Sequence, residues 1–231
     1  MTRAPDWLQT VMLWTSPAFP VGAFSYSHGL EWLVETGQVT DRTSLESFIR
    51  ALLEFGDLQA DAAFLCAAHR GNDMDLALVL EEAVSLRGAS ELAAESVNQG
   101  RAFIKALQLE GTHYPRLSAL QNTMPDVGIP HAVAFGAACA DAGIPLETAV
   151  ESWMHGAVAN LVSAGQRLIP LGQRDGVAAL MALKKPSIRG CLDHDETRFP
   201  YRPGPHWHWR SGRLWQDGAD GSAVQGDARQ L

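Results

Sequence analysis

The sequence has few cysteines and no long apolar run. Its three cysteines, Cys66, Cys139 and Cys191, lie far apart and outside any CxxC pair, which excludes a disulfide framework and a thiolate zinc site. No stretch approaches the roughly twenty consecutive apolar residues of a membrane-spanning helix. Residues 1–14 contain one Arg and an apolar stretch broken by polar residues, so they lack the apolar core of a signal peptide. We therefore expect a cytoplasmic protein that neither enters nor crosses a membrane.

Nucleotide and nucleic-acid sites are missing as well. There is no G-x-x-x-x-G-K-[ST] loop and no G-x-G-x-x-G after a strand, so any energy coupling must come from a partner. The formal net charge is −8, and the acidic excess lies before Pro186, where 12 Lys and Arg face 20 Asp and Glu. Binding to phosphate groups needs clustered cations, so nucleic acid is not an expected partner. No cofactor is expected either.

Helical periodicity is present throughout residues 1–185. Ala and Leu recur at spacings of three and four, and strand-like alternation is nearly absent, so the chain is predicted to be all-α. Thr43, Ser44 and Glu46 match a capping box, which predicts a helix start at Thr43. Gly56 then interrupts the apolar stripe, which leaves either one kinked helix or two. Further helices are predicted at about 74–86, 90–109, 130–142, 146–168 and 173–184. The result would be a single bundle of about seven helices.

Small residues are dense in the two segments 132–140 and 156–164. They permit close helix packing, and a tight internal helix pair is favoured over a dimer seam, although both can hold at once. After Lys185 the composition changes, and Pro, Gly, Trp and His appear without helical or strand periodicity. We expect a helical domain at 1–185 and an irregular, poorly ordered or loosely docked tail at 186–231.

The first motif is the segment 16–31, SPAFPVGAFSYSHGLE. Two prolines and two glycines shape its backbone, and several polar side chains follow one another. Ser25, His28 and Glu31 would suit a small all-α hydrolase that uses a nucleophile, its base and an orienting acid. No G-x-S-x-G elbow accompanies them, so a loop that enters a helix, capped by Ser25 or Ser27, is the favoured interpretation.

The second motif is the segment 160–176, NLVSAGQRLIPLGQRDG. Together with His155 just before it, the polar residues Asn160, Ser163 and Arg167 follow spacings of five, three and four, so three of them can share one face of an apolar helix. Two interpretations remain open. The residues either form an internal hydrogen-bond network or face a partner, with Arg167 binding a carboxylate.

A metal site is not predicted. His206 and His208 lie near acidic residues at 193–196, but two imidazoles without a rigid third ligand bind nickel or zinc only weakly. An accidental arrangement is therefore favoured. His69, His113 and His131 stand singly and are expected to be helix-surface or core histidines rather than ligands.

Taken together, the two motifs resemble the two signatures of the UreF family of urease accessory proteins. The segments 130–140, PHAVAFGAACA, and 143–145, GIP, also resemble that family's small-residue helix and turn, so the likeness covers about residues 8–183. It implies an all-α, usually dimeric chaperone and scaffold of the cytoplasm that catalyses nothing itself. Such a protein binds UreD, also called UreH, and the GTPase UreG, and takes part in nickel insertion into apo-urease.

The resemblance also implies which residues contact partners. In the first signature these are Ser25, Tyr26, His28 and Glu31, and in the second they are Arg167, Gln173 and Asp175.

The tail departs from the family. The resemblance implies a further helix after Lys185 and then a short segment with a Met-x-x-x-x-His-Glu-like pattern that helps partner docking. That pattern is missing here. The enrichment in Trp, Arg, Pro and His is what a reading-frame slip near residues 186–191 would produce, and such a slip would impair binding of UreD.

Overall fold

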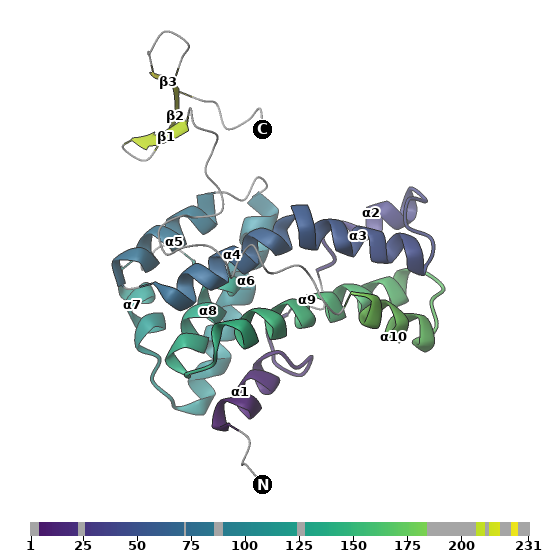
Figure 1. The fold of residues 1–231 in the computed structure, drawn as a ribbon, viewed down its shortest axis with the longest axis horizontal. Helices are drawn as coiled ribbons and strands as arrows, with labels where there is room; N and C mark the ends of the chain where they lie inside the picture. The colour runs from purple at the N-terminus through teal and green to yellow at the C-terminus, as the bar shows by residue number, and fades with distance from the viewer. Residues whose placement is uncertain are drawn as a thin grey trace. The chain divides into compact units, whose positions relative to one another are not determined.

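A computed structural model of the protein describes residues 5–22, 26–71, 73–85, 90–123, 128–183, 207–210, 213–217 and 223–225. The chain divides into two compact units, Met1–Asp193 and His194–Leu231. Figure 1 shows the helices of the first unit and the strands of the second. The boundary expected after residue 185 lies outside the described residues.

The described part of the first unit consists of ten α-helices and one short 3-10 helix, which confirms the all-α fold. About seven helices had been predicted. The helices are α1 (Asp6–Trp14), α2 (Leu30–Glu35), α3 (Arg42–Phe55), α4 (Asp57–Arg70), α5 (Asp73–Ser85), α6 (Ser90–Leu107), η2 (Gln108–Glu110), α7 (Pro115–Thr123), α8 (His131–Asp141), α9 (Leu146–Leu168) and α10 (Gln173–Ala182).

Helix α8 lies at the centre of the core. Every residue from Ala132 to Cys139 is buried, and the helix packs against α4 and α6. A Cβ added to Gly136 would lie 2.4 Å from the carbonyl oxygen of Leu65, so only glycine allows the backbones of α4 and α8 to come this close. The dense small residues of this segment therefore allow close internal packing of α8, as predicted, but the helix that α8 packs against most extensively is α4 rather than α9 with its small-residue segment 156–164.

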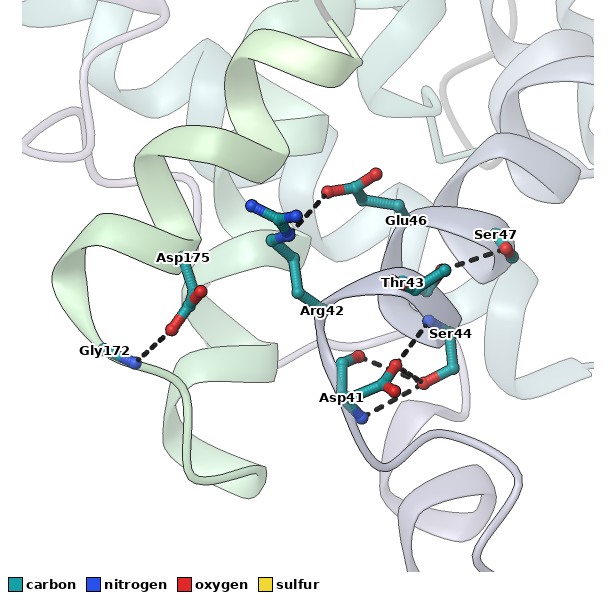
Figure 2. A network of polar contacts seen from close by, with 8 residues as sticks. All are labelled: Asp41, Arg42, Thr43, Ser44, Glu46, Ser47, Gly172 and Asp175. Carbon is teal, nitrogen blue, oxygen red and sulfur yellow. Dashed lines mark hydrogen bonds and ion pairs between the residues drawn. The ribbon is translucent and has the colours of Figure 1, made fainter.

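The start of α3 differs from the prediction. The N-cap is Asp41 rather than Thr43: the Asp41 carboxylate accepts from the Ser44 amide at 2.8 Å, and the Asp41 amide donates to Ser44 Oγ at 3.1 Å. Figure 2 shows this capping box. Asp is a strong N-cap, and the earlier start leaves Glu46 free of a capping role, so its carboxylate pairs with Arg42 Nε at 3.3 Å one turn away.

The break expected at Gly56 separates two helices. Gly56 has extended dihedral angles, φ −111° and ψ −164°, and serves both as the C-cap of α3 and as the N-cap of α4. The alternative of a single kinked helix is thereby excluded.

Helix α9 connects most of the first unit. It contacts α1, α2, α3, α4, α8 and α10, and Figure 1 shows α2 and α10 at one end of the unit, away from α5 and α7. The first helix, α1, contacts the core through Trp14. Its Nε1 donates to Glu110 at 2.9 Å, and its ring lies edge-on to that of Phe103. The packing around α9 thus gathers elements that are distant in sequence.

The second unit contains a small antiparallel sheet of order β1-β2-β3. Its strands are β1 (Trp207–Arg210), β2 (Arg213–Asp217) and β3 (Ala223–Gln225), with Trp209 opposite Leu214 in the first pair. No alternating pattern in the sequence had indicated these strands.

Candidate functional site

The first motif begins as a succession of tight turns. The Phe19 amide donates to the Ser16 carbonyl at 2.9 Å, and the Val21 amide donates to the Phe19 carbonyl at 2.8 Å. The Phe19 side chain is buried and its ring lies 5.6 Å from that of Phe103 in α6. Residues 23–25, and with them the candidate Ser25, lie outside the described residues. The described start of the motif is therefore anchored in the core by one aromatic side chain.

Residues 26–31 form a turn that leads into α2, here named the 26–31 turn. His28 has φ 54° and Gly29 has φ 81°, so two successive residues adopt the left-handed conformation. The Leu30 amide donates to the Ser27 carbonyl at 3.2 Å, and the Leu30 side chain is completely buried. Because Leu30 points into the core, the next residue, Glu31, is exposed at the start of α2. The turn thus presents a carboxylate on the surface.

A polar contact within the turn joins Ser27 to Glu31, one of the three residues proposed for a hydrolase. The buried Ser27 hydroxyl donates to the Glu31 carboxylate. The Nδ1 atom of His28 is buried. Tyr26 is half-buried, and its carbonyl faces α9. Glu31 therefore accepts from a serine of the same turn. The loop does enter a helix, α2, as expected, but the N-cap of that helix is Gly29 with no side-chain cap, so the expected cap by Ser27 is wrong, and Ser25 lies outside the described residues.

The second motif spans the end of α9, a tight connection and the start of α10. The Leu171 amide donates to the Ile169 carbonyl at 2.7 Å, and Ile169 is buried. Asp175 caps α10, since its Oδ2 accepts from the Gly172 amide at 3.2 Å, as Figure 2 shows. Gln166 closes the same connection by donating to the Gly172 carbonyl at 3.3 Å. The candidate Asp175 therefore has a structural role at the helix start in addition to any partner contact.

Arg167 and Gln173 are exposed at this end of the fold. Arg167 Nη1 donates to Ser163 Oγ at 3.1 Å, one turn earlier on α9, which confirms that these two residues share a face. The guanidinium lies at the surface of the described part of the fold.

The two motifs meet at Asn160. Its side-chain amide donates to the Tyr26 carbonyl at 3.0 Å, across 134 residues of sequence, and α2 packs against α9 beside it. Arg167 lies seven residues further along α9, about 10 Å along the helix axis at 1.5 Å per residue. The described candidates are thus spread over the 26–31 turn, α9 and the start of α10. Such a spread suits contact with a macromolecule better than chemistry on a small substrate.

Sequence reasoning had singled out Asn160 only as a polar residue on an apolar helix, and it had not paired Asn160 with Tyr26. The spacing signal was correct, since Asn160 and Ser163 both have partners. The identity of the partner carbonyl could not be found from periodicity, because a backbone acceptor has no sequence signature.

The described residues were also compared with the requirements of a metal site and of a membrane-spanning helix. Among the side chains that the structure describes, no group of three or more His, Cys, Asp and Glu residues is placed to hold a metal ion. The candidates at residues 193–196 and His206 lie outside the described residues. Within the described ranges, no helix is both long and apolar enough to cross a membrane.

Comparison with known proteins gives a consistent result. Residues 39–184 match the protein family described as UreF. A protein named urease accessory protein UreF from Rhodopseudomonas palustris strain TIE-1 is 41% identical over 188 residues, which cover 77% of this chain and 75% of the relative. A protein of the same name from Azorhizobium caulinodans is 38% identical over 186 residues, 79% of each chain. A third, from Granulibacter bethesdensis, is 42% identical over 191 residues, 81% of this chain and 80% of the relative.

Proposed function

Because the chain belongs to the UreF family of urease accessory proteins, we propose that it acts in urease maturation as a scaffold that catalyses nothing itself. A role in nickel insertion into apo-urease follows from the family. The proposed partners are UreD, also called UreH, the GTPase UreG and apo-urease, with the chain acting as a homodimer in the cytoplasm.

The observation that carries this proposal is the meeting of the two family motifs at the Asn160–Tyr26 hydrogen bond, 3.0 Å long. It joins the 26–31 turn to α9, and the described partner-contact candidates lie on these elements and on the adjoining α10. Glu31 offers a carboxylate, Arg167 a guanidinium and Gln173 an amide, all of them exposed. A surface with both charge signs and a few polar anchors is what a protein needs to position other proteins.

The test combines one substitution from each motif. The full chain that carries both Tyr26→Ala and Arg167→Ala is co-expressed with UreD, UreG and apo-urease, and co-purification and urease activity are measured. We expect recovery of the complex and urease activity each to fall by about tenfold or more, because removal of interface anchors commonly costs over 1 kcal/mol each. Unchanged co-purification and activation would overturn the proposed contact surface.

A matched control lies on the same helix. Glu151 is exposed on α9, sixteen positions before Arg167 and outside both motifs. Glu151→Gln removes one surface charge at such a site, and we expect wild-type co-purification and urease activation. Thermal unfolding of both variants shows whether a loss of binding reflects a loss of folding.

A further inference from the structure

Asn160 connects α9 to the 26–31 turn. We propose that it is a positioning residue for partner binding, which sets the direction in which the 26–31 turn presents Tyr26 and Glu31. This inference rests on the proposed function, because it assigns to Asn160 a role through residues that contact the partner. Asn160 itself is not assigned a contact with the partner.

A hydrogen bond ties Asn160 to the backbone of the 26–31 turn. The Asn160 Nδ2 atom donates to the Tyr26 carbonyl at 3.0 Å, and the contact is partly buried. Neighbouring α9 residues Val158 and Leu161 are buried at 3% and 1% exposure, so the amide stands at the edge of an apolar stripe. A partly buried carbonyl that loses its donor loses a hydrogen bond that water replaces only in part. The bond therefore restrains the orientation of the Tyr26 carbonyl at the beginning of the turn.

The Asn160–Tyr26 hydrogen bond supports an unusual backbone conformation in the turn. His28 is not glycine and yet has φ 54°, directly before Gly29 with φ 81°. The left-handed region is unfavourable for a residue with a Cβ, and such a conformation persists only where surrounding contacts favour it. The turn then leads into α2, which has six residues and is too short to be stable in isolation. The 26–31 turn must therefore be held by contacts with the rest of the fold.

The two ends of the 26–31 turn are held by different residues. Leu30, with no exposed surface, fixes the end of the turn in the core, and the Ser27 hydroxyl contacts Glu31 within the turn. Asn160 holds the beginning of the turn, at Tyr26. With the end fixed by Leu30 and the beginning held by Asn160, the positions of the Tyr26 side chain and the Glu31 carboxylate relative to α9 are set. Preorganisation of this kind raises affinity by reducing the loss of conformational freedom on binding.

The experiment uses the full chain with two substitutions at one position. Asn160→Asp keeps the shape of the side chain and removes its N–H donors, whereas Asn160→Ala removes the side chain beyond Cβ. Binding to UreD and UreG is measured on the co-expressed complex. We expect both variants to bind about tenfold more weakly than wild type, with Glu151→Gln as the matched α9 control that binds as wild type.

Two readouts separate positioning from general stability. In a chain that already carries Tyr26→Ala and Glu31→Ala, Asn160→Ala should weaken binding by less than about twofold further, because both side chains that Asn160 positions are then gone. Amide hydrogen exchange in Asn160→Ala should rise within residues 26–31 and stay at the wild-type level in α3 and α8. Additive losses of affinity, or a rise in exchange throughout the helical unit, would overturn the inference.

The outcomes also distinguish this inference from the proposed function. If Tyr26→Ala weakens binding and Asn160→Ala does not, the positioning role is wrong while the contact surface stands. If neither Tyr26→Ala nor the double variant with Arg167→Ala weakens binding, the proposed contact surface is wrong, and the positioning role is overturned with it.

Discussion

At the residue scale, single side chains join helices that are far apart in sequence. Arg116, at the start of α7, donates through Nη1 to the carbonyl of His69 in the last turn of α4 at 2.8 Å and to that of its C-cap Gly71 at 2.7 Å. Its Nε lies 3.8 Å from Asp141 at the end of α8, and its amide donates to the same carboxylate at 2.9 Å. One residue thus satisfies free carbonyls at a helix end and neutralises a largely buried acid. Asn160 links α9 to the 26–31 turn by the same principle.

His131 gives a prediction about pH at this scale. Its ring lies among those of Phe103, Phe135 and Trp153, and its Nε2 is buried without a hydrogen-bond partner in the described part of the chain. Burial lowers the pKa of His131 from 6.5 to about 4. The unfolded chain therefore takes up a proton near pH 6.5, whereas the folded chain does so only near pH 4. Stability should fall as pH drops through this window, by at most roughly 3 kcal/mol.

The measurement is urea unfolding of the full chain at several pH values from 7 to 4. His131→Phe keeps an aromatic ring of similar size and removes the titrating group, so we expect a clearly flatter dependence of unfolding free energy on pH. A His131→Phe variant with the wild-type pH dependence would show that other groups cause the acid destabilisation.

The sequence could not distinguish between the surface and core alternatives for this residue. His131 follows Pro130 at the first position of α8, where the Ala-rich pattern is apolar on every side and leaves no polar face to compare. Its burial depends on Phe103 and Trp153, which come from α6 and α9 and are distant in sequence. For α3, only Thr43 was predicted from the sequence as the N-cap. The structure places the cap two residues earlier, at Asp41.

At the element scale, the long periodic helices were predictable and the short ones were not. The predicted segments at about 74–86, 90–109, 130–142, 146–168 and 173–184 agree with α5, α6, α8, α9 and α10 to within two residues at each end. Pro and Gly mark most of their boundaries, and their apolar stripes extend over several turns. Helices α1 and α7 were missed, and α2 was expected only as the helix that the loop 16–31 enters, without bounds. Helices of nine residues or fewer show little periodicity and are stabilised mainly by packing.

Two helical glycines provide a matched prediction about packing. A Cβ at Gly136 of α8 would lie 2.4 Å from the Leu65 carbonyl oxygen, whereas a Cβ at Gly156 of α9 would meet nothing closer than the Thr15 carbonyl oxygen at 3.7 Å. Gly136→Ala should therefore destabilise the protein by about 1–3 kcal/mol, because α4 and α8 must move apart. Gly156→Ala should stabilise it by roughly 0.5–1 kcal/mol through its higher helix propensity.

Urea unfolding followed by circular dichroism measures both changes under the same conditions. Both variants add one methyl group to a helical glycine, which is buried in α8 and half-buried in α9. The difference between their unfolding free energies therefore isolates the close approach of α4 and α8. Equal effects of the two substitutions would contradict the assignment of α4 and α8 as a helix pair whose contact requires glycine.

At the scale of the whole molecule, the site was predictable as two motifs and not as one surface. The resemblance identified segments 16–31 and 160–176 as parts of one family pattern, and the structure brings them together at Asn160 and Tyr26. The contact joins residues 134 positions apart, so it depends on how α2 packs against α9, which no local pattern encodes. The roles of Tyr26, His28, Glu31, Arg167 and Gln173 in partner binding stay predictions until they are tested, as does that of Ser25.

The tail is the other feature of the whole chain that calls for an explanation. The match to the UreF family ends at residue 184, next to the point where the sequence changes character. The first compact unit, Met1–Asp193, contains that match, whereas the second, His194–Leu231, contains only short strands among its described residues. A single-base slip in the coding DNA leaves everything upstream intact and changes every residue downstream, so it accounts for an abrupt boundary of this kind.

We predict that the coding DNA, read in another frame from within codons 186–191, encodes a further segment with helical periodicity and then a Met-x-x-x-x-His-Glu-like pattern. Resequencing the gene checks this directly. A chain expressed in the restored frame should bind UreD about tenfold more tightly than the present chain, because it regains a docking segment. The helices α1 to α10 should unfold at the same temperature, since residues 1–185 are unchanged. If neither alternative frame encodes such a segment, the tail belongs to this chain and the slip is excluded.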